Sequence, residues 1–166
     1  MGNSTLAMGG NLKVHTGLDE AARHKVATAL GPVLADTFAL YLKTHTYHWN
    51  VTGPLFPQLH PMFQEQYNAL WISVDDLAER IRALGFPAPG GLAALGKLSS
   101  LGEPAVAPSA EEMIRDLMEG HEALARALRP VAEIAGEAGD IVTEDLMVQR
   151  IDAAEKTAWM LRVQLA

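Results

Sequence analysis

The sequence predicts an all-α protein, a four-helix bundle with a long central crossover that carries one short helix. Apolar residues recur at helical spacing along four segments of about 25 residues, and strand-like alternation does not compete with this pattern. Residues 85–108, between the second and third segments, contain five glycines and four prolines, a composition typical of a connection rather than a helix. A bundle with one such crossover has its second and third helices parallel.

Length and composition favour a single domain. The chain has 166 residues, of which 49% are hydrophobic and 20% charged, enough to bury a core unaided. We expect a flexible arm over residues 1–18 and the bundle domain over residues 19–166. The first residues lack the features of a secretory signal, and an apolar run of about 18 residues occurs nowhere. The sequence therefore predicts a cytoplasmic protein without a membrane partner.

The first two helices have clear start signals. Asp19 is a candidate N-cap for a helix that continues to about Asn50, and Gly31-Pro32 is a point where this helix could bend. Residues 51–56 read as a turn. Pro57 then suits the first turn of a second helix, which runs to about Leu84.

The remaining helices follow the crossover. A short helix is expected within residues 92–98. Ser109 and Glu112 form a capping box that opens the third long helix, which ends near Ala135. After a glycine-rich turn at residues 136–139, the fourth helix starts at Asp140 or Thr143 and reaches the C-terminus, where we expect core and subunit-interface positions. Four helices with this central connection fit a ferritin-like bundle.

Composition also limits the chemistry. The chain has no cysteine, which removes disulfides, thiolate catalysis and zinc ribbons. Any metal must be held by nitrogen and oxygen ligands, a set that favours iron, manganese or zinc. The net charge of −7 opposes non-specific binding to nucleic acid phosphates and suits cations better.

The candidate ligands lie on the first two helices. The usual di-iron bundle carries Glu-x-x-His on two helices, whereas in this chain no Glu is followed by His three residues later. At 100° per residue, four other candidates on the second helix fall at about 0°, 40°, 60° and 100° and share one face. These four residues are His60, Gln64, Asp75 and Glu79.

Distance along the helix axis separates these four candidates into two pairs. His60 and Gln64 lie about 22 Å along the axis from Asp75 and Glu79, too far for one metal. If two copies of the helix pack antiparallel about a twofold axis near Leu70 or Trp71, each pair meets the opposite pair of the other subunit. His48, at the end of the first helix, is within reach of the His60 end. We therefore expect two identical sites per dimer, each built from both chains.

Each candidate also has a plain structural interpretation. The bundle could be an ordinary one without metal, and Asp75 and Glu79 could form a solvated face. His60 could simply start a helix, and His48 could be a core residue bonded to a backbone carbonyl. The two histidines and two carboxylates can meet only if two subunits pair. This shared requirement favours the metal site over four separate structural interpretations.

The sequence resembles the Dps family of mini-ferritins. The resemblance rests on Lys43-Thr-His-Thr-Tyr-His-Trp-Asn-Val-Thr-Gly53 and Ala78-Glu-Arg-Ile-Arg-Ala-Leu-Gly85, with Phe56, His60, Met62, Phe63, Tyr67 and Asp75 between them. It implies a homo-oligomer, a dodecameric shell with ferroxidase centres at its twofold interfaces. His48 and His60 would come from one subunit, and Asp75 and Glu79 from its partner. These four residues would catalyse oxidation of Fe(II) by hydrogen peroxide, or by dioxygen, and Fe(III) would be stored inside.

One position departs from the family pattern. Gln64 stands where the family usually carries Asp or Glu, and an amide oxygen does not balance the charge of iron. The second iron of each centre should therefore bind more weakly. His45, one turn before His48, is a possible compensating ligand, and the alternative is a surface or hydrogen-bonded histidine. Trp49 corresponds to an aromatic residue that packs near the centre and takes up oxidising equivalents.

The resemblance further implies acidic pores at threefold axes. The candidates here are Asp140, Glu144 and Asp145, and rings of such carboxylates would concentrate cations. Acidic residues at a helix N-terminus are also what capping and the helix dipole favour. Both interpretations stay open at the level of sequence.

DNA binding is the family property that the sequence supports least. The family commonly uses a basic terminal tail, whereas the arm before Asp19 has only Lys13. Contacts from Lys13, Arg23 and Lys25, multiplied over a shell, would be weak, and only such binding would associate the protein with the nucleoid. Two alternatives to iron oxidation and storage remain: a DNA-compacting stress protein with weak ferroxidase activity, and a helical assembly that binds another metal.

Overall fold

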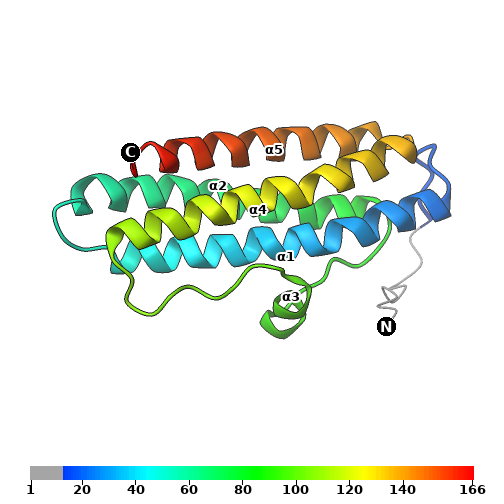
Figure 1. The fold of residues 1–166 in the computed structure, drawn as a ribbon. Helices are drawn as coiled ribbons and strands as arrows, with labels where there is room; N and C mark the ends of the chain where they lie inside the picture. The colour runs from blue at the N-terminus through cyan, green and yellow to red at the C-terminus, as the bar shows by residue number, and fades with distance from the viewer. Residues whose placement is uncertain (1–12) are drawn as a thin grey trace.

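The structure, a computed structural model, describes residues 13–166, which form five helices and no strand. The helices are α1 (Glu20–Asn50), α2 (Phe56–Ala83), α3 (Leu92–Leu98), α4 (Ala110–Glu137) and α5 (Ile141–Arg162). Figure 1 shows the four long helices side by side in one bundle, with α3 outside it against α1. The expected all-α fold with a short crossover helix is confirmed.

Helix ends follow local chemistry. The Asp19 carboxylate accepts a hydrogen bond from the Ala22 amide at 2.7 Å, and both hydrogen bonds of the Ser109 and Glu112 capping box are present. α4 ends two residues later than expected, because the left-handed residue that ends the turn is Gly139, with φ of +71°. Pro32 lies inside α1, which continues through it. Capping residues thus predict where these helices start more accurately than glycine-rich composition predicts where they end.

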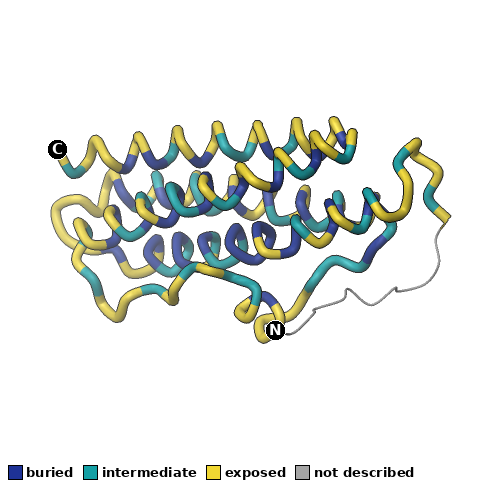
Figure 2. The backbone as a smooth tube through the Cα atoms, turned by 45° about the vertical axis from the view of Figure 1, so that its right-hand side comes forward, coloured by how far each residue is buried: buried dark blue, intermediate teal, exposed yellow. Residues whose placement is uncertain are grey.

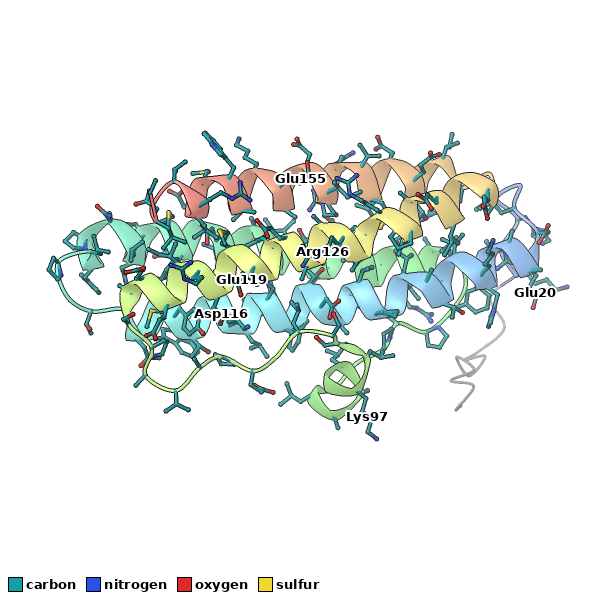
Figure 3. All side chains as sticks on the ribbon, viewed as in Figure 1. Glu20, Lys97, Asp116, Glu119, Arg126 and Glu155 are labelled. Carbon is teal, nitrogen blue, oxygen red and sulfur yellow. The ribbon has the colours of Figure 1, made fainter. Side chains whose placement is uncertain are left out.

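The core lies between the four long helices. Figure 2 shows buried positions along their inner sides and exposed positions outside. The largest fully buried side chains include Tyr47, Phe63 and Phe86. Charged side chains such as Lys97, Glu119 and Arg126 project from the outside of the helices (Figure 3). This inward apolar packing holds α1 against α2, where the candidate ligands lie.

The crossover lets α2 and α4 run in the same direction, as Figure 1 shows. Two buried polar contacts tie it to α1. Asp36 accepts hydrogen bonds from the Ser99 hydroxyl at 2.8 Å and from the Ser100 amide at 2.6 Å. Further along, the Tyr47 hydroxyl accepts the Ala105 amide at 3.1 Å and donates to Asp116 of α4. The crossover is therefore attached to α1 at two points.

Most of the arm expected over residues 1–18 lies outside the described residues. From Lys13 to Leu18 the chain is not helical, and Val14 lies close to Gly85 at the end of α2. Among residues 13–166, no helix combines the length and the apolar character needed to cross a bilayer.

Candidate metal centre

Two histidines face each other where the end of α1 meets the start of α2. Their rings are stacked, with centroids 3.8 Å apart. The two residues also exchange hydrogen bonds. His48 Nδ1 lies 2.8 Å from the His60 carbonyl oxygen, and His60 Nδ1 lies 2.9 Å from the His48 carbonyl oxygen.

These reciprocal contacts have a direct consequence for ligand chemistry. A backbone carbonyl can only accept, so each Nδ1 carries the hydrogen and donates it. In a neutral imidazole the lone pair is then on Nε2, and a carbonyl bonded to Nδ1 is the usual means of orienting a histidine that binds metal. In both histidines, Nε2 is therefore the ring nitrogen that remains able to bind a metal. His48 does bond a backbone carbonyl, and that bond is compatible with metal binding.

Aromatic side chains pack around this pair. Tyr67 stacks on His45 with centroids 4.0 Å apart and meets His48 edge-on at 5.2 Å. Phe56 packs on His60 at 4.8 Å, and Trp49, which is mostly exposed, lies 4.3 Å from His45. Apart from their backbone bonds, the two candidate ligands are thus held by aromatic surfaces.

His45 occupies a defined place in this cluster. Its Nδ1 lies 3.2 Å from the Tyr41 hydroxyl, and its ring centroid is 6.0 Å from that of His48. Burial, together with the charge of His48, lowers the pKa of His45. The hydrogen-bonded alternative for His45 is therefore realised, and its Nε2 is not used in that bond.

The carboxylates lie elsewhere on α2. Asp75 and Glu79 are exposed, and within residues 13–166 neither has an ion-pair partner. Arg80 instead bonds Asp140 and Thr143, and Arg82 donates to the Phe86 carbonyl. No group of three or more metal-binding side chains forms within the described part of one chain. Within the described part of one chain, the two histidines and the two carboxylates are therefore separate groups.

The face that carries the carboxylates is also apolar. Trp71 and Ile72 are 55% and 60% exposed, although large apolar side chains are normally buried. They lie on α2 between the histidine end and the carboxylate end. Gln64 is exposed one turn after His60. This part of α2 thus combines potential ligands with uncovered apolar surface.

The three pore candidates differ in their surroundings. Asp140 is only 2% exposed. Its carboxylate caps α5 through the Thr143 amide at 3.0 Å and pairs with Arg80 at 2.7 Å, so it is not free to line a pore. Glu144 and Asp145 are exposed on the first turn of α5. Of the two interpretations that the sequence left open, capping is therefore the one that describes the contacts of Asp140 within one subunit.

Two neighbours of the histidines were not predicted to lie at the centre. Tyr67 and Phe56 were named only as part of the family resemblance, yet they contact the histidine rings. The signal for Tyr67 was its position seven residues after His60, two helical turns further along the same face. The exchanged backbone bonds of His48 and His60 had no such signal, since they depend on how the turn brings the two helices together.

Known proteins resemble the chain over most of its length. A family model described as a ferritin-like domain matches residues 27–166. A low temperature-induced protein of Nostoc sp. is 38% identical over 152 residues, covering 90% of this chain and 85% of that protein. The DNA protection during starvation protein 2 of Bacillus anthracis is 36% identical over 141 residues, covering 85% of this chain and 97% of that protein.

Solved structures agree with these relatives. The crystal structure of the DPS protein from Vibrio cholerae O1, described as a member of a broad superfamily of ferritin-like diiron-carboxylate proteins, aligns with a TM-score of 0.89. It is 33% identical and covers 95% of this chain and 100% of that one. From this likeness and the domain match, the chain belongs to the Dps family of ferritin-like mini-ferritins.

Proposed function

We propose that this protein oxidises Fe(II), with hydrogen peroxide as the oxidant, at centres shared between subunits, and stores the ferric product inside a dodecameric cage. Oxidation of two Fe(II) ions by one peroxide molecule yields two Fe(III) ions and two hydroxide ions. In this reaction iron is the substrate. The proposal also assigns a protective role, because it consumes two reactants that together generate hydroxyl radicals.

The observation that carries the proposal is the His48 and His60 pair. Its two Nδ1 atoms lie 2.8 and 2.9 Å from backbone oxygens, so both Nε2 lone pairs are available for iron. Orientation by backbone groups reduces the reorganisation needed when iron arrives. The two matched carbonyl contacts fix both rings with the same nitrogen left free, which is the arrangement that a pair of metal ligands requires.

The partner subunit would complete each centre. Asp75 and Glu79 supply the negative charge that hard iron ions require, and they are exposed and unpaired within residues 13–166. An antiparallel pairing of two α2 helices would bring these carboxylates to the histidines of the other chain. The same pairing would bury Trp71 and Ile72, which are exposed in the single subunit, and this burial would favour association.

Iron would reach the cage interior through acidic openings. Of the residues considered, Glu144 and Asp145 are exposed at the start of α5, and repeated copies around a symmetry axis would attract cations. We assign this role to those two residues and exclude Asp140, which Arg80 neutralises.

Subunit mixing tests the shared centre. After the assembly size is measured, anaerobic Fe(II) titration followed by peroxide addition counts the sites and measures turnover. His60→Ala and Asp75→Ala should each abolish rapid oxidation, whereas assemblies that contain both variants should recover part of it. Recovery is expected because some interfaces then pair an intact histidine end with an intact carboxylate end.

The matched control mixes His60→Ala with His48→Ala. Both of these changes affect the histidine end, so both centres at every mixed interface lack one histidine and no recovery is expected. Equal recovery in both mixtures, or none in either despite proven exchange of subunits, would refute the intersubunit centre. A folded monomer with full activity would refute it as well.

A further inference from the structure

A second polar site lies inside the bundle, away from the candidate metal centre. It is a cavity of about 50 Å³ between the four long helices, and its polar lining includes Gln66, Ser73, His121 and Arg150. None of these residues is a proposed iron ligand. Gln66 follows His60 by six residues, about 9 Å along α2.

The cavity collects polar atoms that have no hydrogen-bond partner within residues 13–166. These atoms are Gln66 Oε1, Arg150 Nε and both ring nitrogens of His121. His121 is only 3% exposed. Buried polar groups are nearly always paired in folded proteins, since an unpaired one has lost its hydrogen bonds to water without replacement. The three residues that carry these atoms all line this one cavity, so a molecule bound there would lie beside them.

The charge of the lining restricts what this molecule can be. Burial lowers the pKa of His121 to about 4, so its ring is neutral near pH 7 and offers one donor and one acceptor. Arg150 keeps its positive charge and donates from another nitrogen to the Ser73 hydroxyl at 2.7 Å. A metal cation would find no carboxylate among the lining residues. Arg150 also places a positive charge beside the cavity, although it pairs with Asp76 at 3.6 Å.

An anion fits no better than a cation. An anion without an O–H group could accept from Arg150 Nε and from the His121 ring, but it could not donate to Gln66 Oε1 or to the second His121 nitrogen. If the Gln66 amide is turned the other way, the acceptor on His121 still needs a donor. A small neutral molecule that both donates and accepts satisfies all of these atoms.

We propose that the cavity lined by Gln66, His121 and Arg150 binds small neutral molecules that both donate and accept hydrogen bonds, namely water and hydrogen peroxide. Its volume of about 50 Å³ is several times the roughly 10–15 Å³ that one water requires on the same measure. Peroxide has the same hydrogen-bonding character and is only slightly larger. The peroxide part rests on the proposed function, which makes peroxide the oxidant.

A high-resolution crystal structure of the intact, metal-free protein tests the shared chemistry. We expect ordered oxygen atoms within hydrogen-bond distance of His121 and Gln66, with at least one of them also bonded to Arg150. A dry cavity would overturn the proposal. An anion or a metal ion bound there, identified by its anomalous signal, would also overturn it.

A single introduced thiol tests the entry of peroxide. The chain has no cysteine, so Ala154→Cys places one thiol at the cavity wall. Ala158→Cys is the matched control, because Ala158 lies one turn further along α5, does not line the cavity and is equally buried, at 2% against 3% exposure. Ser73→Cys, nearly equal in size to the native side chain, is a second cavity probe if Ala154→Cys does not fold.

The readout is the fraction of thiol that can still be alkylated after peroxide is quenched and the protein unfolded. Methionine oxidation does not affect this count. We expect the cavity thiol to be lost roughly tenfold faster than the control thiol, because peroxide can reach it and the charge of Arg150, which lines the same cavity, favours the reactive thiolate. Equal, slow loss of both thiols would exclude peroxide and leave water as the ligand. The protein is metal-free throughout, so this result is independent of whether the iron centre works.

Discussion

At the scale of single residues, the same hydrogen bond fits both a structural histidine and a metal ligand. The contact of His48 with the His60 carbonyl is what a structural core histidine would make, and it is also what orients a metal ligand. The reciprocal contact from His60 favours the second interpretation. A histidine is therefore better judged as a candidate ligand by which of its ring nitrogens remains free than by how deeply its side chain is buried.

Gln64 gives a prediction at this scale. Gln64→Glu should strengthen the weaker iron position of each centre, because a carboxylate adds the negative charge that the amide lacks. Oxidation at low iron should become faster if occupancy limits the rate. Iron stoichiometry and peroxide-driven oxidation measure both effects, with His45→Ala alongside. If the native protein already binds two irons per centre tightly and neither substitution changes the second, the weakened ligand and its compensation are both wrong.

Asp140 gives a second residue-scale prediction, for acid stability. Burial alone would raise the pKa of Asp140, but hydrogen bonds from Arg80 and Thr143 and the charge of Arg80 outweigh burial, so the pKa is lowered. The ionised carboxylate therefore stabilises the fold fully above its unfolded pKa of about 4, and this contribution is lost as pH falls through the lower folded value.

The variant Asp140→Asn keeps a capping side chain and removes the charge. We expect it to be less stable than the native protein at pH 7 by about 1.5–3 kcal/mol. The difference should shrink as pH drops below about 4. Thermal unfolding across this pH range measures it, with Asp152→Asn as the exposed control. A difference that is constant with pH would contradict the assigned ion pair.

At the scale of elements, the crossover is attached to α1 by a few buried polar contacts. Asp36 is buried on α1 and accepts from the Ser100 amide at 2.6 Å and from the Ser100 hydroxyl at 2.9 Å. The Ser99 hydroxyl donates to the same carboxylate at 2.8 Å. These bonds hold the segment that follows α3 close to the bundle.

Asp36→Ala should accordingly destabilise the fold by about 1.5–3 kcal/mol, because it removes a charged acceptor and leaves a backbone amide unpaired. Hydrogen exchange at Ser100 should speed up more than exchange in the middle of α4. Asp152→Ala, at an exposed position of α5, is the control and should change neither quantity. Unchanged protection at Ser100 would show that the crossover is held by other contacts.

At the scale of the whole molecule, charge opposes binding to DNA. The chain carries a net charge of −7. Two of the three cations considered for phosphate contacts are engaged within the subunit. Arg23 is buried and donates to the Leu84 carbonyl at 2.7 Å, and Lys25 pairs with Glu137 at 3.0 Å. Lys13 is exposed.

We therefore expect little retardation of DNA at physiological salt, even by the assembled protein. Gel shifts over a range of salt concentrations measure this, with Lys13→Ala to test the exposed cation. Tight binding that survives about 0.2 M salt would reveal a basic surface created by assembly.

Sequence analysis predicted the helices well where local chemistry sets their ends. The caps at Asp19 and Ser109 and the short helix Leu92–Leu98 are as expected, because these features depend on neighbouring residues. Asp140 was harder to interpret. Capping a helix and lining a pore both call for an acidic residue at a helix start. Only the contact with Arg80, 60 residues earlier in the chain, favours capping.

By itself, the sequence determined the four long helices, the crossover and the family, and it placed four of the candidate ligands on one face of α2. These properties follow from periodicity, capping and motif spacing, all of which are local along the chain. Only the tertiary structure decided how the His48 and His60 rings are oriented, that Asp140 is buried with Arg80, and that Gln66, His121 and Arg150 share a cavity. Those contacts join residues distant in sequence, and packing in three dimensions selects them.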